Sequence, residues 1–335
     1  MSKQQDNSRS DTPINSAGLV QSTQIMSRLN EKTYWDSIHV REQEEVEAAA
    51  RPDQELTGNN PATLKGRIKK LLGKSVLERI SNYDGYLLTQ VILPRVLPDI
   101  AGTHFVEIGS APGEFIVDFS KRYGCIPYGV EYSAVGVEVN RKVFQQSGFA
   151  PDNVIHTDFF SDDFANRYRE HFDGVLSRGF IEHFEDVGPV IDRHLHVLKP
   201  GGYLIVSVPN LRGFNYFLSR FFDEGSIARH NLRIMTKKAY SSLFQRGDLQ
   251  TLFCDYYGTF SLYLFTPGPS QVKRTTLRFC RKLQPALNFT FRTLCQDKGL
   301  ESSLFSPSLL YIGRKLSANR VRTAPAETDH PVLTF

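Results

Sequence analysis

Short apolar runs alternate with helical segments from residue 104 onward, and this alternation constrains the fold more than any other feature of the chain. Strands that alternate with helices form a parallel sheet with helices on both faces. Two later runs are predicted to close the sheet as an antiparallel pair. The predicted strands are Phe105–Ile108, Ile126–Glu131, Val154–Thr157, Gly174–Ser177 and Tyr203–Val208, followed by Leu249–Tyr257 and Leu309–Arg314.

The chain divides by composition into a principal domain with flanking segments. Residues 1–30 are rich in Ser, Gln, Asn and Asp and are predicted to be disordered, as are residues 317–335. Residues 31–100 are predicted as an N-terminal helical segment. Residues 101–316 form the predicted principal domain.

Helical spacing marks the segments that flank the predicted sheet. Tyr34–Ala50 and Leu64–Leu93 are predicted helices, and Pro94 and Pro98 should end the second. Inside the principal domain, the chain carries an insertion at about 210–235 and a basic segment at about 270–298. Pro285 should kink or split any helix in that basic segment.

Charge and cysteine content exclude several classes of protein. The net charge of the 335 residues is only +4, which does not by itself indicate a nucleic-acid partner. The four cysteines are scattered without a C-x-x-C pair, so neither a disulfide framework nor a metal site is predicted. No run of 18 apolar residues occurs, and the polar N-terminus does not resemble a secretory signal. We expect a cytoplasmic protein.

The turn after the first predicted strand has the composition of a ligand-binding loop. The stretch His104–Phe115 reads H-F-V-E-I-G-S-A-P-G-E-F. Gly109, Ala111 and Gly113 are small enough for a backbone to approach a ligand closely. Glu107 is an acid at the end of a buried strand, where a bound polar group or backbone amides must satisfy it.

Acidic residues also follow the second and third strands. Glu131 stands 24 residues after Glu107, where an acid can accept hydrogen bonds from both hydroxyls of a ribose. Asp158, with Phe159 beside it, could accept from an adenine amino group and cover the ring. The alternatives are a helix N-cap or surface acid for Glu131, and an ordinary loop or cap residue for Asp158.

Two further motifs complete the pattern. The fourth strand leads into Ser177-Arg178-Gly179-Phe180-Ile181-Glu182-His183-Phe184, and the fifth follows an L-K-P-G-G turn that starts at Leu198. His183 could be a general base for a substrate hydroxyl, or could only pack beside the ligand. Glu182 could cap or buttress the next helix.

Five motifs in this order resemble the class I S-adenosylmethionine-dependent methyltransferase superfamily over about residues 80–260. They are E-x-G-x-A-x-G, G-V-E, an Asp after the third strand, I-E-H-F and L-K-P-G-G. The last two motifs resemble its small-molecule branch. Ala111 stands where the commoner loop has a glycine. The resemblance implies an enzyme with a Rossmann-like doubly wound α/β fold: a seven-stranded sheet, mostly parallel with an antiparallel last strand, and helices on both faces.

The resemblance also implies a cofactor, S-adenosylmethionine, and a role for each motif. The first loop would contact the amino-acid end of the cofactor, Glu131 would hold the ribose, and the loop after the fourth strand would line the sulfonium end. The residues so implied are Glu107, Gly109, Ser110, Ala111, Gly113, Glu131, Tyr132, Asp158, Phe159, Ser177 and Arg178.

The acceptor is expected to be a small molecule: a hydroxylated metabolite, a sugar or a lipid-linked compound. The acceptor atom and the oligomeric state stay open. Candidate acceptor contacts in the insertion, each with a solvated or salt-bridged surface role as the alternative, are Asn210, Arg212, Asn215, Tyr216, Arg229, His230, Asn231 and Arg233. The basic segment could touch an anionic membrane surface, or be a helical face packed on the domain.

Two other functions compete with this interpretation. The A-P-G turn is similar to that of ribose 2′-O-methyltransferases of RNA. However, the acid and lysine expected at later strand ends are replaced by Ser177-Arg178 and Ser207. A non-catalytic scaffold that keeps the fold is disfavoured, because Gly109, Gly113 and Glu131 are all present. A dinucleotide-dependent oxidoreductase has no obvious use for the I-E-H-F and L-K-P-G-G motifs.

Overall fold

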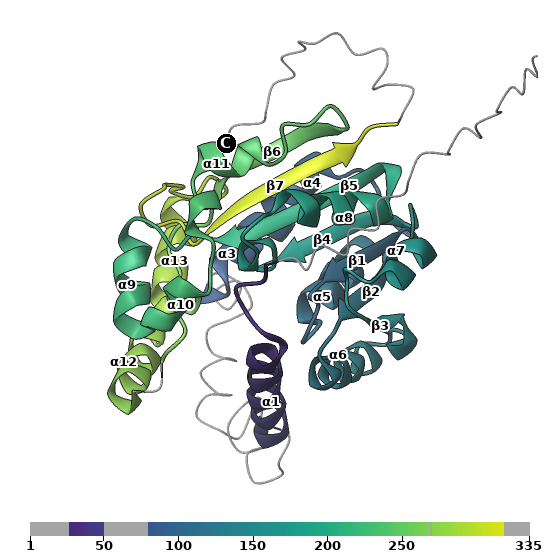
Figure 1. Ribbon diagram of the computed structural model, residues 1–335. Helices are drawn as coiled ribbons and strands as arrows, with labels where there is room; N and C mark the ends of the chain where they lie inside the picture. The colour runs from purple at the N-terminus through teal and green to yellow at the C-terminus, as the bar shows by residue number, and fades with distance from the viewer. Residues whose placement is uncertain (1–26, 50–79, 269, 318–335) are drawn as a thin grey trace, which may run out of the picture.

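The computed structural model describes residues 27–49, 80–268 and 270–317 and has a seven-stranded sheet at its centre (Figure 1). The strand order is β3-β2-β1-β4-β5-β7-β6. β1 to β5 pair in parallel, and β7 is antiparallel to both β5 and β6, which confirms the predicted fold class. The strands are β1 (His104–Ile108), β2 (Ile126–Glu131), β3 (Val154–His156), β4 (Phe172–Arg178), β5 (Leu198–Pro209), β6 (Leu249–Tyr257) and β7 (Ser308–Lys315).

Helices connect these strands and precede them. The longest of the described helices is α1, near the N-terminus (Figure 1). The α-helices are α1 (Lys32–Ala49), α3 (Tyr83–Tyr86), α4 (Leu93–Val96), α5 (Glu114–Tyr123), α6 (Ala134–Gln146), α7 (Asp162–Arg167), α8 (Gly188–Val197), α9 (Phe214–Phe222), α10 (Glu224–Ala228), α11 (Lys237–Ser242), α12 (Gln271–Arg281) and α13 (Gln284–Leu294). A π-helix, η2 (Leu87–Ile92), joins α3 to α4, and the 3-10 turns are η3 (Pro151–Asn153), η4 (Ile181–His183), η5 (Leu232–Ile234) and η6 (Leu262–Leu264).

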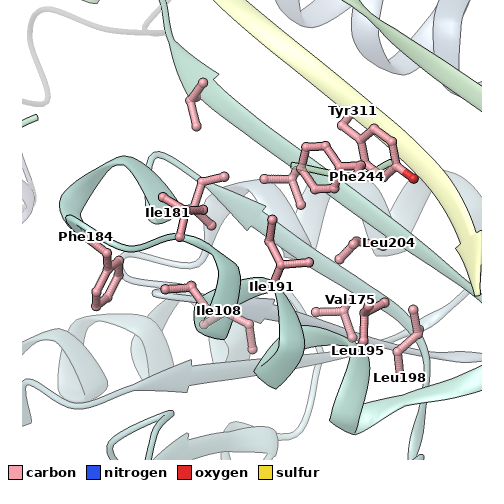
Figure 2. Packing of buried hydrophobic residues seen from close by; sticks show 14 of the residues in the cluster. Ile108, Val175, Ile181, Phe184, Ile191, Leu195, Leu198, Leu204, Phe244 and Tyr311 are labelled. Carbon is pink, nitrogen blue, oxygen red and sulfur yellow. The ribbon is translucent and has the colours of Figure 1, made fainter. Parts of the chain in front are cut away.

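Successive side chains of a strand point to opposite faces of the sheet, and helices pack on both faces of this sheet and bury them. Ile108 of β1 belongs to a core cluster with Ile191 and Leu195 of α8 (Figure 2). Phe105 belongs to a second cluster, with Ile116 of α5 on the other face. Side chains in the middle of the sheet therefore pack in the core, and polar side chains that could bind a ligand lie in the loops at its edges.

The seven predicted strands are all present, and their boundaries differ by a few residues. The largest difference is in β5, which begins at Leu198 rather than at Tyr203. Leu198 pairs with Phe172 of β4 ahead of an irregularity in the ladder, so the strand extends back through the L-K-P-G-G turn.

Pro94 does not end the preceding helical stretch, contrary to the prediction. The wide turn of η2 lets the N–H of Leu93 reach the carbonyl of Leu88, five residues back. Pro94 then falls in the first turn of α4, where a missing N–H costs little. The helix ends at Val96, before Pro98.

The basic segment forms two helices, α12 and α13, with Pro285 in the first turn of the second, as the predicted split requires. Leu277 of α12 is buried and clusters with Phe222 of α9 and with Phe265. Arg274 and Arg278 on α12 are exposed. One face of this helix is therefore packed on the insertion, with arginines on the rest of its surface.

Several predictions lie partly outside the described residues. These are the tails, for residues 1–26 and 318–335, and the predicted helix Leu64–Leu93, for residues 64–79. Among the helices that are described, none combines the length and the apolar character that a membrane span requires.

Gly174 of β4 tests the packing at the centre of the sheet. A Cβ atom there would stand 2.0 Å from the ring of Phe105, which is fully buried. We expect Gly174→Ala to lower the free energy of unfolding by about 2 kcal/mol, the usual cost of overpacking a core. Urea denaturation measures the change. Gly247→Ala is the matched control, because nothing lies within 4 Å of a Cβ at Gly247; equal stability of the two variants would contradict the packing argument.

Candidate functional site

Two cavities adjoin at the carboxyl edge of the parallel strands, where the strand order reverses between β1 and β4. The larger has a volume of about 1250 Å³ and the smaller about 160 Å³. Both are lined by Gly109, Ala111, Arg178, Gly179 and His183, so these five residues form the junction between them.

The first loop lines this junction and is built from residues that tolerate little change. Gly109 and Gly113 have φ values of +68° and +95°, which side chains rarely adopt. A Cβ at Gly113 would also stand 2.1 Å from Oδ1 of Asn140. Ser110 is buried, and its hydroxyl accepts a hydrogen bond from the side chain of Asn140. The small residues thus keep the turn tight beside an open space.

Glu107 and Arg178 line the larger cavity from two neighbouring strands. Burial raises the pKa of Glu107 to about 7, and the opposing influence of the Arg178 guanidinium is smaller. Oε2 of Glu107 has no hydrogen-bond partner among the described residues. Arg178 packs over the ring of Phe115. An unpartnered carboxylate oxygen beside a cavity is a ready acceptor for a ligand N–H.

Glu131 lines the smaller cavity with Tyr132 and is neither a helix cap nor a surface acid. It is 4% exposed, and its Oε1 accepts from the backbone N–H groups of Tyr132 and Ser133, at 2.9 and 2.8 Å. The N-cap of α6 is Ser133. Burial raises the pKa of Glu131, and these backbone donors oppose the shift. The two N–H groups hold the carboxylate in a fixed orientation.

Asp158 and Phe159 line the smaller cavity too, and Asp158 is already engaged. Its carboxylate accepts two hydrogen bonds from Arg28, at 2.7 and 2.8 Å, and one from the N–H of Phe160. The N-cap of α7 is Ser161, so Asp158 does not cap that helix. Phe159 is buried and packs against the rings of Phe160 and Phe180.

Ser177 does not line either cavity, whereas the next residue, Arg178, lines both. The Ser177 side chain is fully buried in β4, and its Oγ has no partner among the described residues. Alternation along the strand explains this placement, since neighbouring side chains point to opposite faces.

His183 lies at the junction of the cavities within the turn η4. Its Nδ1 lies 3.0 Å from the carbonyl oxygen of Arg229 and 2.6 Å from the side-chain nitrogen of Asn30. The Trp35 ring meets the imidazole edge-on, with the ring centroids 4.9 Å apart. Burial lowers the pKa of His183 to about 3. The imidazole is therefore neutral at physiological pH.

Most candidate acceptor contacts in the insertion have structural partners. Asn210 and Asn215 are buried and donate to the carbonyl of Ser306. Arg229 forms an ion pair with Asp223. Arg212 donates to the Leu232 carbonyl, and Asn231 donates to the carbonyls of Phe184 and Glu185. Tyr216 packs against Phe217, and Arg233 is exposed. Of the eight candidates, only His230 lines the larger cavity.

The N-terminal segment covers the smaller cavity, which the sequence did not indicate. Residues 27–30, assigned to a disordered tail, are bound to η4: the N–H of Leu29 donates to the His183 carbonyl at 2.8 Å. Four residues of this segment and α1 line the cavity: Arg28, Asn30, Trp35 and His39. The one available signal was that Trp35 is the only tryptophan of the chain.

Comparison with known proteins assigns the chain to a family. A family model described as "Methyltransferase domain" matches residues 80–256, more than half of the chain. The chain belongs to this family. The class I S-adenosylmethionine-dependent methyltransferase superfamily, predicted from the sequence motifs, is thereby confirmed, and with it S-adenosylmethionine as the cofactor.

Individual relatives share only low sequence identity with this chain. The ubiquinone biosynthesis O-methyltransferase of Chelativorans sp. (strain BNC1) is 29% identical over 117 residues, 35% of this chain and 44% of that protein. Its counterpart from Bradyrhizobium sp. (strain ORS 278) is 32% identical over 111 residues, 33% of this chain and 42% of that protein. The matches thus span less than half of these relatives. A geranyl diphosphate C-methyltransferase from Streptomyces coelicolor A3(2) aligns with a TM-score of 0.46 at 14% identity, over 77% of this chain and 86% of its own.

Arg28→Ala tests whether the N-terminal segment is held on the site by the Arg28–Asp158 ion pair. The substitution also removes the contacts of Arg28 with the rings of Tyr132 and Phe160. We expect the amide of Leu29 to exchange with solvent at least about fivefold faster, because local opening becomes easier by roughly 1 kcal/mol. Hydrogen–deuterium exchange mass spectrometry reads this out. Arg233→Ala is the control, and unchanged exchange in Arg28→Ala would refute the role of the ion pair.

Proposed function

We propose that the protein transfers the methyl group of S-adenosylmethionine to a hydroxyl oxygen of a small molecule. The observation that carries the proposal is the junction of the two cavities. The smaller cavity holds an oriented carboxylate and aromatic walls for a nucleoside, the larger has room for an acceptor, and the two meet at five shared residues.

The cofactor would lie across this junction. In the smaller cavity, the Glu131 carboxylate faces the ribose hydroxyls, and Asp158 and Phe159 border the adenine. The first loop and Glu107 take the amino-acid end. The free Oε2 of Glu107 suits a ligand ammonium group, and the Arg178 guanidinium suits a carboxylate. The sulfonium then falls near His183.

The acceptor would occupy the part of the larger cavity beyond the junction. Its wall carries Asn82, Asp84, Gln90, Ser261 and Ser308. The pKa of Asp84 is raised to about 6 by burial, and the Thr259 N–H donates to its carboxylate at 3.3 Å. Side chains of this kind hydrogen-bond hydroxyl groups, which fits a hydroxylated acceptor. The names of the relatives, O-methyltransferases of ubiquinone biosynthesis, support oxygen as the acceptor atom.

The chemistry requires alignment above all. An acceptor oxygen forms a bond to the methyl carbon as the carbon–sulfur bond breaks, and that electron pair stays on sulfur to give S-adenosylhomocysteine. The hydroxyl proton leaves to a base or to water. His183, at the junction, would orient the acceptor, because its lowered pKa makes the imidazole a weak base.

Glu131→Ala tests the cofactor half of the proposal. Loss of a charged acceptor for ribose hydroxyls costs about 1.5 to 3 kcal/mol, so we expect S-adenosylhomocysteine to bind roughly tenfold to a hundredfold more weakly by calorimetric titration. Glu138→Ala is the control, because Glu138 is an exposed helix residue paired with Lys142. Equal affinity of wild type and a folded Glu131→Ala protein would refute the assignment.

Acceptor screening tests the second half. We expect label from methyl-labelled S-adenosylmethionine to appear in a hydroxylated small molecule as a methyl ether, identified by mass spectrometry. Methylation only at carbon or nitrogen, or only of RNA, would overturn the proposal. Tight cofactor binding without transfer to any member of a panel of phenols, sugars and lipid-linked alcohols would favour a scaffold.

A further inference from the structure

Glu182, His183 and His230 form a cluster on the wall of the larger cavity. One carboxylate oxygen and one ring nitrogen from each histidine lie within 4.8 Å of one another. Nε2 of His183 is 4.0 Å from Oε1 of Glu182, and the two imidazole centroids are 4.6 Å apart. The sequence analysis predicts no metal site, and His230 stands 47 residues after His183 in the chain.

Glu182 lacks the partners that a buried carboxylate normally requires. It is 1% exposed, and neither of its carboxylate oxygens has a hydrogen-bond partner among the described residues. No lysine or arginine in that part of the chain forms an ion pair with it. A buried charge without a counter-charge is costly, so a carboxylate in this position calls for a proton or a cation beside it.

The two histidines differ in what their ring nitrogens contact. Nδ1 of His183 lies 3.0 Å from the Arg229 carbonyl oxygen and 2.6 Å from the side-chain nitrogen of Asn30. Nδ1 of His230 contacts only the Ser226 carbonyl oxygen among the described residues, so it carries the hydrogen and donates it, which leaves a lone pair on Nε2. Metal-binding histidines are usually fixed in this way by a backbone carbonyl.

We propose that Glu182, His183 and His230 bind one divalent first-row transition-metal cation. Two imidazoles and one carboxylate suit such ions, and three protein ligands leave positions open for an outside oxygen. Ligands about 2.1 Å from a tetrahedral ion lie about 3.4 Å apart, so binding draws the three groups together by roughly 1 Å. All three residues line the larger cavity.

The site deepens the proposed function, on which its catalytic role rests. A cation at this wall would bind the acceptor hydroxyl and lower its pKa, so that the proton passes to water before the oxygen takes the methyl group. Catechols and other vicinal diols, which can chelate through two oxygens, are the acceptor class that such an ion favours.

Cobalt binding tests the site without reference to activity. Protein stripped with chelator is titrated with Co²⁺, and binding is followed by visible absorption and by metal analysis after dialysis. We expect one Co²⁺ per chain, displaced by Zn²⁺. Glu182→Gln and His230→Gln should each weaken binding at least about a hundredfold, because each loses a direct ligand. His156→Gln, at an exposed histidine of β3, is the control.

Binding of S-adenosylhomocysteine to the same samples separates this inference from the proposed function and shows that each variant is folded. Retained cofactor binding with weakened cobalt binding in both variants supports the site. Cobalt binding that is absent in wild type, or unchanged in Glu182→Gln and His230→Gln, overturns the metal site while leaving the methyltransferase proposal intact. Loss of cofactor binding in all samples would refute the proposed function instead.

Discussion

Burial of both faces of the sheet at β1 and β4 is the constraint on which the site depends. Ile108 and Val175 pack under α8, and Phe105 and Leu176 pack on the opposite face. The middle of each strand therefore offers no place for polar chemistry. Polar side chains collect at the carboxyl ends, where the strand order reverses and two neighbouring loops diverge.

This arrangement buries several carboxylates, and burial of a charged group is energetically unfavourable. Glu107, Glu131 and Glu182 are at most 5% exposed, and burial raises the pKa of each. Glu131 is compensated by two backbone N–H groups, while Glu107 and Glu182 keep carboxylate oxygens without partners in the described chain. A free protein bears that cost, and a ligand that supplies a donor or a cation relieves it. Glu107 and Glu182 thus mark two points where a ligand can gain binding energy.

Local sequence patterns predicted the strands and the first loop, but they could not predict contacts between segments that lie far apart in the chain. The strands and the first loop follow from alternation and from small residues, both readable within a dozen positions. Ser177 lies beneath the cavities although its loop was predicted to line them, because strand alternation turns its side chain inward. Arg28 and Trp35 reach the smaller cavity from segments far away in the chain, and no local periodicity encodes that approach.

The turn η4 links the smaller cavity, the larger cavity and the N-terminal segment. Its backbone accepts from the N–H of Leu29, and its His183 ring touches Asn30 and Trp35 from one side and His230 from the other. The N–H of Asn231 donates to the Glu182 carbonyl at 2.7 Å, which ties the insertion to the same turn. A displacement of the N-terminal segment would therefore disturb the Glu182–His183–His230 cluster as well as the smaller cavity. Under the proposed function, covering the cofactor and arranging the acceptor wall would be one event.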